Sequence, residues 1–259
     1  MQLAQTASAL GLHEYRDQPP SRETFKQFHA LVMETFRLHG ITPTYFGAEG
    51  EGYPDKYTKI SGRAYSKLIE SDFSGICELS LAANPSTSGA PAYDSFASAS
   101  LGYVDAMQEL LLCVVVNEAF IKIRSAEWEA LVGAFTRFHR WDFGYGFSGN
   151  VADQPELYIM GMDNGRLSKE DQELLNAWYA APADVRVRRL RDVYPYNLLN
   201  EQQLHQEIRA GVRLKDFIEQ QPGCTLTRLT DDGLYQCKVS DDTILDQLRK
   251  QLRGLPIMV

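Results

Sequence analysis

The chain has 259 residues, of which 44% are hydrophobic and 23% are charged. These values are ordinary for a soluble globular protein with one large domain or two modest ones. Its net charge of -8 argues against nonspecific binding to nucleic acid or to an anionic membrane, because both require a basic surface. The same charge fits a basic protein partner as well as no partner at all.

Targeting and redox signals favour the cytoplasm. The N-terminus lacks the basic region and the apolar core of a signal peptide, and the longest apolar run, Leu110 to Val116, is too short to span a bilayer. The four cysteines are scattered and are typical of small buried residues. A Cys224–Cys237 bridge across a hairpin is conceivable, but a reducing compartment disfavours it. We therefore expect a soluble cytoplasmic protein.

The first sixty residues contain one predicted helix. Residues 1–20 are interpreted as a loose lead-in that ends at two prolines. Ser21 is a good N-cap, and apolar residues then recur at spacings of three and four until Gly40, which predicts a helix. Residues 41–62 are rich in Gly and Tyr and have no helical period, so we expect an exposed loop or short irregular strands there.

The middle of the chain favours a sheet. A short helix at 63–71 precedes strands near 76–81 and 96–104, and a long polar loop at 85–93 joins the two strands. The apolar and β-branched run Glu109–Phe120 predicts a central strand with both faces covered.

Two further patterns follow that strand. Ser125 caps a predicted helix whose buried face carries Trp128, Phe135 and Phe138. The segment FGYGF at 143–147 predicts a strand, and its glycines allow close approach by a helix or a neighbouring chain.

The last third of the chain mixes helices with a hairpin. Ser168 begins a helix that stops before Pro182, and arginines then alternate with apolar residues. We expect the chain's own carboxylates, rather than nucleic acid, to balance these arginines. Tyr194–Asn197 is interpreted as a turn, after which Asn200 caps a helix. An Asp-Gly hairpin and a final helix complete the chain.

These elements predict an α+β fold with a mixed or antiparallel sheet covered by helices. Residues 21–199 would form the main domain. Residues 200–259 would form a small helix-hairpin-helix subdomain packed on it.

No catalytic or metal-binding motif is recognisable. H-E-x-x-H, G-x-S-x-G and Walker lysine motifs are missing, and the five His residues are isolated from one another. His139 near Asp142 is interpreted as a local charge contact at a helix end. Gly47, Gly50 and Gly52 resemble a phosphate loop only superficially, because the acids between them would repel phosphate. We therefore expect no catalytic residue, no cofactor, no metal and no enzymatic activity.

Acidic and aromatic residues are interleaved in one segment. Between positions 141 and 173 there are seven acidic residues and two basic ones, among several large rings. Such a surface suits a cationic protein, because the rings can anchor it and the acids can steer its association. The alternative is a solvated helix start beside a core strand.

Four segments carry a family resemblance. FGYGFSGN, PELYIMG, SKEDQELLNAWY and LRDVYPYNLLNEQQL resemble immunity proteins of bacterial polymorphic toxin systems. Among these the chain is most similar to the Imm52-like group, which is associated with restriction-endonuclease-fold toxins delivered by type VI secretion. The resemblance spans residues 40–255, except for the loop at 84–93. It implies a cytosolic α+β protein that binds its cognate toxin, covers or distorts the toxin's active site, and performs no reaction.

Two other functions stay open. An effector chaperone or adaptor would bind a secreted protein without neutralising it. A small hydrolase of unrecognised type would need no partner.

The predicted partner-binding surface consists of two acidic loops with aromatic anchors. Such loops could occupy the basic rim of a nuclease as phosphate mimics. The residues are Glu49, Glu51, Tyr53 and Asp55 in the first loop, and Asp153, Glu156, Tyr158 and Asp163 in the second. The alternative is that both loops are only solvated.

Overall fold

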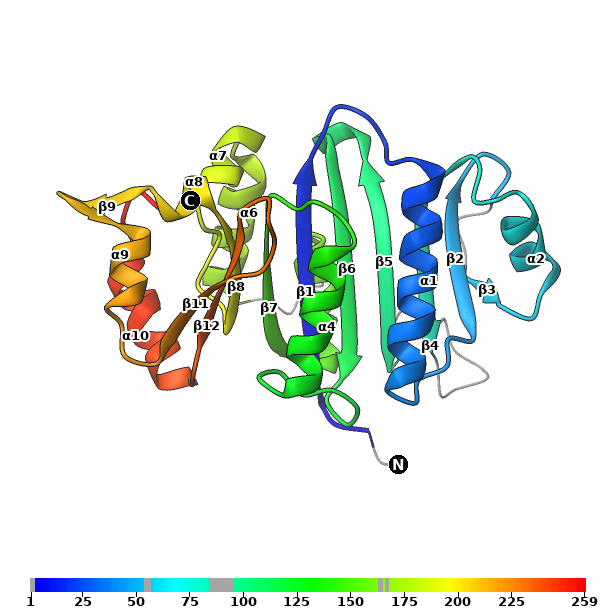
Figure 1. Ribbon diagram of the computed structural model, residues 1–259, viewed down its shortest axis with the longest axis horizontal. Coiled ribbons are helices and arrows are strands. Elements are labelled where there is room, and N and C mark those ends of the chain that lie inside the picture. The colour runs from blue at the N-terminus through cyan, green and yellow to red at the C-terminus, as the bar shows by residue number, and fades with distance from the viewer. Residues whose placement is uncertain (1–2, 54–56, 84–95, 163–164, 166–167) are drawn as a thin grey trace.

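The computed structural model describes residues 3–53, 57–83, 96–162, 165 and 168–259. Within these residues, ten strands form one sheet in the order β11-β12-β8-β7-β1-β6-β5-β4-β2-β3, and helices cover both faces (Figure 1). Every neighbouring pair is antiparallel. The predicted α+β class is confirmed, and its sheet is antiparallel.

Strands and helices follow one another irregularly along the chain. The strands are β1 (Thr6–Tyr15), β2 (Tyr45–Gly50), β3 (Thr58–Lys59), β4 (Ile76–Ala83), β5 (Ala97–Val104), β6 (Glu109–Asn117), β7 (Phe143–Asn150), β8 (Tyr196–Asn200), β9 (Glu207–Arg209), β10 (Val212–Arg213), β11 (Cys224–Arg228) and β12 (Leu234–Val239). The helices are α1 (Arg22–Leu38), α2 (Arg63–Glu70), α4 (Ala126–Arg137), α5 (Pro155–Ile159), α6 (Lys169–Ala180), α7 (Ala183–Arg188), α8 (Glu201–Leu204), α9 (Leu214–Glu219) and α10 (Asp242–Leu252), with 3-10 turns η1 (Asp105–Met107) and η2 (Val151–Asp153). In the described part of the chain, no helix is both long and apolar enough to cross a membrane.

The N-terminal segment lies in the middle of the sheet. β1 pairs with β6 on one side and with β7 on the other, and most of its residues are buried. The prediction of a loose lead-in at 1–20 is therefore wrong. The first half of this strand consists mostly of small residues, which have little β-propensity. Close packing of α5 against the strand nevertheless requires a small residue at Gly11. A Cβ on Gly11 would lie 2.9 Å from the side chain of Ile159 in α5.

The predicted central strand is confirmed. β6 is buried along almost all of its length and lies between β1 and β5. β5, which pairs with β6, and β4, which pairs with β5, were predicted as well. Residues 41–62 contain β2 and β3, which are the short strands that the sequence allowed. The polar loop predicted at 85–93 lies outside the described residues.

Helices α1 and α4 cover one face of the sheet, called the front face here (Figure 1). Ser21 and Ser125 cap these helices as predicted, by accepting hydrogen bonds from backbone N–H groups. The front layer is a continuous apolar core in which Trp128 is fully buried. It includes Leu10, Leu12, Phe25, Phe28, Val32, Phe36, Leu79, Leu81, Leu101, Leu112, Val114, Leu131 and Phe135.

The glycines of β7 allow close approach, as the sequence predicted. A Cβ on Gly144 would lie 2.5 Å from the backbone oxygen of Gly11 in the neighbouring strand. A Cβ on Gly146 would lie 2.9 Å from the ring of Trp128 in α4. Glycine therefore lets β1 and α4 contact β7 directly.

Residues 200–259, called the C-terminal unit here, share the main sheet. β12 pairs with β8, and β8 pairs with β7, so the hairpin β11–β12 extends the sheet. The turn predicted at Tyr194–Asn197 is only partly right, because β8 begins at Tyr196 directly after Pro195. The unit nevertheless has its own apolar cluster, which includes Leu204, Ile208, Leu214, Phe217, Cys237, Val239, Leu245, Leu248 and Leu252.

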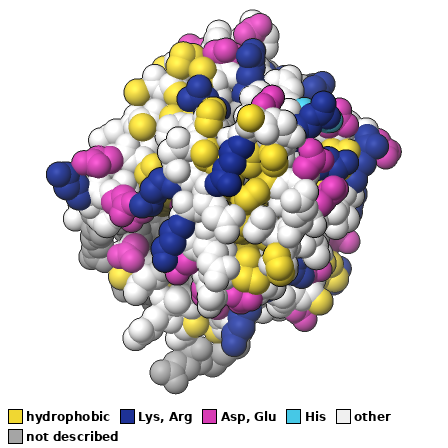
Figure 2. Space-filling model, turned by 90° about the vertical axis from the view of Figure 1, so that its left-hand side faces the viewer, with side chains coloured by type: hydrophobic (Ala, Val, Ile, Leu, Met, Phe, Trp, Pro, Cys, Tyr) yellow, Lys and Arg dark blue, Asp and Glu magenta, His cyan; other side chains and the backbone are white. Residues whose placement is uncertain are grey.

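The end of the molecule formed by the C-terminal unit carries both signs of charge. Figure 2 shows basic and acidic side chains interspersed around hydrophobic ones on this end. The unit contains eight Lys or Arg residues and nine Asp or Glu residues. Most of the chain's net negative charge therefore belongs to residues 1–199.

Candidate functional site

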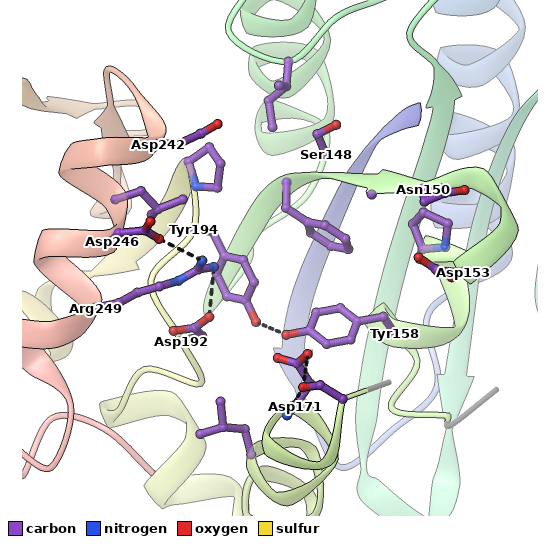
Figure 3. A pocket seen from close by; sticks show the side chains of 18 of the residues that line it. Ser148, Asn150, Asp153, Tyr158, Asp171, Asp192, Tyr194, Asp242, Asp246 and Arg249 are labelled. Atoms are coloured by element: carbon purple, nitrogen blue, oxygen red, sulfur yellow. Dashed lines mark hydrogen bonds and ion pairs between the residues drawn. The ribbon is translucent and has the colours of Figure 1, made fainter. Parts of the chain in front are cut away.

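A groove of about 950 Å³ lies between α10 and the segment that follows β7 (Figure 3). Helix α10 forms one wall, to which it contributes Asp246 and Arg249. η2, α5 and the start of α6 form the opposite wall, to which they contribute Asp153, Tyr158 and Asp171. The groove thus lies between the C-terminal unit and the main part of the chain.

Local capping signals position these walls. The side chain of Asn150 caps η2, and Pro155 occupies the first turn of α5. Ser168 and Asp241 cap α6 and α10, respectively, through hydrogen bonds to backbone N–H groups. Such residues favour a helix start wherever they occur. Local residues therefore determine where each helix of the walls begins, whereas the order of strands in the sheet brings the two walls together.

Aromatic rings form the floor of the groove. The hydroxyls of Tyr158 and Tyr194 are 3.0 Å apart and share a hydrogen bond. Phe147 packs edge-on against Tyr158, with the ring centroids 5.2 Å apart. All three side chains line the groove. Phe147 and Tyr158 are partly exposed and offer apolar surface with a polar edge, whereas Tyr194 is buried beneath them.

A buried cation supports this floor from behind. Arg191 is 3% exposed, and it donates hydrogen bonds to the Tyr145 hydroxyl at 2.7 Å and to the Tyr158 carbonyl at 3.0 Å. Its guanidinium lies 4.0 Å from the centroid of the Tyr158 ring. It forms no ion pair with a carboxylate of the described residues. Tyrosine rings and hydroxyls compensate this charge in place of an acid.

Acidic side chains outnumber basic ones along the groove. Among the described residues that line it, the acids are Glu118, Asp153, Glu170, Asp171, Asp192, Asp242 and Asp246, and the bases are Arg124, Arg249, Lys250 and Arg253. Three arginines are already paired: Arg249 with Asp192 and Asp246, Arg253 with Glu170, and Arg124 with Asp242. Asp171 instead accepts a hydrogen bond from the Ser168 hydroxyl. The groove therefore has an excess of negative charge.

Two carboxyl groups in the segments around the groove are partly desolvated: Asp192, which lines the groove, and Glu156, which does not. Burial raises the pKa of Asp192, and the neighbouring Arg249 guanidinium opposes this shift. Burial also raises the pKa of Glu156 in α5. Both groups favour a nearby positive charge, because a cation lowers the free energy of a desolvated carboxylate.

The structure separates the two acidic loops that the sequence singled out. Asp153 and Tyr158 line the groove, whereas Glu156, partly buried in α5, is not among its lining residues. Asp163 lies outside the described residues. The α10 wall was not predicted as part of a site, because nothing in the local sequence shows that α10 faces α5.

The other loop lies near the opposite edge of the sheet, next to the edge strand β3. Glu49 and Glu51 are exposed at the end of β2, which four strands separate from β7 in the sheet order. Tyr53 packs locally against α2, where its hydroxyl is 3.0 Å from that of Ser71. Asp55 lies outside the described residues. The structure does not bring Glu49, Glu51 or Tyr53 into the groove.

A second group of buried charges lies between the sheet and α7. His13 Nδ1 is 2.5 Å from Glu109 Oε1, and Arg186 is 3.7 Å from the other oxygen of Glu109. Arg186 also lies over the ring of Tyr15, 4.7 Å from its centroid. These contacts tie β1, β6 and α7 together, and His13, Glu109 and Arg186 are buried. The sequence places Glu109 at the start of a predicted strand, and an acid beside so apolar a run was a usable signal for a buried charge.

Other predicted charge contacts are settled by the structure. Arg186 and Arg188 pair with carboxylates, as expected, whereas Arg191 uses tyrosines. The predicted contact between His139 and Asp142 is wrong. His139 Nε2 is 2.8 Å from Glu14 Oε2 in β1 instead, and Asp142 accepts a hydrogen bond from the backbone N–H of Tyr15.

The comparisons with known proteins concern the fold. No protein-family model matches the sequence, and no curated protein matches it. Among solved structures, the chain is similar to "Pseudomonas aeruginosa T6SS protein PA0821", with a TM-score of 0.62 and 14% sequence identity. The match covers 98% of this chain and 73% of that one. At this identity, the similarity shows a shared fold.

Proposed function

We propose that this protein is an immunity protein that binds a cationic toxin effector and neutralises it without catalysing a reaction. The observation that carries the proposal is the acidic groove with its tyrosine floor. A groove of this kind suits a basic protein surface better than a nucleic acid or an anionic membrane, which its charge would repel.

A nuclease is the toxin class that fits this surface best. A nuclease site must attract phosphate, so lysines and arginines surround it. Acidic side chains can occupy that rim and accelerate association, while buried aromatic anchors slow dissociation. The Imm52-like grouping and the cytoplasmic location belong to the same proposal.

The fold comparison supports an association with type VI secretion. The similar solved protein is described as a T6SS protein, and we extend that association to this chain only as part of the proposal. The acidic loop at β2 is not included in the proposed binding surface, because β2 lies near the opposite edge of the sheet from β8 and β12.

Co-expression tests the proposed function. The product of the neighbouring open reading frame is expressed in a bacterial host with and without this protein, and growth is recorded. We expect the neighbouring product to arrest growth and this protein to restore it. Arrest that continues in the presence of the folded protein would contradict an immunity role. A change in folding or export of the effector without rescue would indicate an adaptor instead.

A further inference from the structure

We propose that the groove receives a lysine- or arginine-bearing segment of the partner, which lies on Phe147 and Tyr158 and contacts carboxylates of both walls. This inference rests on the proposed function and names the part of the partner that the groove recognises. Three features of the groove support it: the arginines that it already holds, its excess of acids, and its dimensions.

The chain's own arginines show which chemistry the groove binds. Arg249 projects from α10 and lies 3.0 Å from Asp192, which belongs to the segment between α7 and β8. Arg253, just beyond the end of α10, reaches Glu170 on α6. Guanidinium groups therefore already link the C-terminal unit to the segment before β8 and to the opposite wall. An incoming arginine would meet carboxylates in an arrangement that suits its planar donors.

The two bridges differ in how readily a partner could replace them. The side chains of Arg253 and Glu170 are each 61% exposed. Solvent screens the attraction between them, so replacing Arg253 by a cation of the partner costs little free energy. The side chains of Arg249 and Asp192 are 34% and 15% exposed, and Arg249 also donates a hydrogen bond to the Val193 carbonyl. We expect a partner to displace Arg253 and to leave Arg249 in place.

The floor suits the stem of a long cationic side chain. Lysine and arginine bury their methylene groups on apolar surface and keep the charged head group in a polar environment. The partly exposed rings of Phe147 and Tyr158 supply the apolar surface, and Asp171 lies at the edge of the same floor (Figure 3). Asp171 contacts the Ser168 hydroxyl rather than a base, so it can accept a hydrogen bond from an added ammonium or guanidinium group.

The dimensions favour a peptide segment over a single small ligand. A volume of about 950 Å³ is at the upper end of ordinary ligand pockets. Exposed acids stand on both walls, with Asp153 on one and Asp246 on the other. A segment that carries several cationic side chains could contact both walls at once, whereas an anionic segment would be repelled by the acid excess.

Binding of a charged probe tests this inference directly. The probe is a short fluorescein-labelled peptide with lysines and arginines in a Gly/Ser background, and its reference carries glutamines instead. We expect the full chain to bind the cationic probe, and the variant Asp153→Lys/Asp246→Lys to weaken that binding on the order of tenfold. The matched control Glu34→Lys/Glu70→Lys makes the same charge change on α1 and α2, and it should weaken binding less than about twofold.

Two results would overturn the inference. Equal weakening by both variants would show that the probe responds only to net charge. Equal affinity for the cationic probe and the glutamine reference would show that charge is not recognised. Carbodiimide cross-linking of the lysine probe gives a second readout, with links expected at Asp153, Asp171 or Asp246. Links at carboxylates outside the groove would contradict the inference.

The growth assay separates this inference from the proposed function. If the Asp153→Lys/Asp246→Lys variant no longer binds the probe but still rescues growth, the immunity role stands and the groove is not the toxin site. If the wild-type protein binds the probe in the groove but rescues nothing, the groove is a cationic-segment site and the immunity role fails.

Discussion

The two faces of the sheet are closed by different chemistry. On the front face, α1 and α4 bury a continuous apolar layer. On the opposite face, called the back face, α5 and the following segments cover His13, Glu109, Arg186 and Arg191 together with several tyrosines. Apolar packing tolerates small shifts, but buried charges are stable only beside particular partners. We therefore infer that the front layer supplies stability, while the back layer fixes how the wall and floor of the groove are placed.

The largest expected effect is on the front face. Trp128→Ala removes a fully buried side chain and should lower the free energy of unfolding by about 3–5 kcal/mol. Urea denaturation followed by circular dichroism measures the change. Leu38→Ala, at a side chain that is 66% exposed on α1, is the control and should change stability by less than about 0.5 kcal/mol. An unchanged midpoint for Trp128→Ala would mean that α4 does not pack on the sheet.

Glu109→Gln tests the charged layer on the back face. The substitution keeps the shape but removes the carboxylate that compensates Arg186 and contacts His13. Leaving a buried charge without its partner should cost about 3 kcal/mol. The exposed Glu34→Gln on α1 is the control for the same chemical change. If the two variants have equal stability, the back face does not depend on buried ion pairs and the contrast between the faces is lost.

The smallest expected effect concerns Glu156, where burial raises the pKa. Because this folded-state pKa lies above the unfolded value, the ionised carboxylate destabilises the fold at neutral pH. That penalty fades as pH falls through the folded-state pKa. Glu156→Gln should therefore raise the melting temperature at about pH 7, and the difference should shrink towards about pH 4. A melting temperature that falls at neutral pH would show that the ionised form is stabilised instead.

Sequence patterns predicted the elements whose signals are local. β6, α4, α6 and the hairpin β11–β12 combine long apolar patterns with clear caps or a turn dipeptide. β1 and β8 were missed for a physical reason. β1 is built from small residues, and β8 follows a Tyr-Pro-Tyr sequence that resembles a turn. Pairing on both sides makes each of them a strand, and no local pattern reports that pairing.

The groove was only half predictable. Interleaved acids and rings near Asp153 and Tyr158 pointed to one wall. The other wall comes from α10, which is distant in sequence and reaches the groove because β12 pairs with β8. The same topology removes Glu49 and Glu51 from the site. Sheet order therefore decides which acidic segments share a surface.

If the protein neutralises a toxin as proposed, the groove, and not the acidic end of β2, should face that toxin. The most direct test measures association rates with the neighbouring gene product over a salt series. The variants are Asp153→Lys/Asp246→Lys in the groove and Glu49→Lys/Glu51→Lys at β2. We predict that the groove variant associates on the order of tenfold more slowly at low salt with a flatter salt dependence, while the β2 variant behaves like wild type. A slow β2 variant beside an unaffected groove variant would contradict the account.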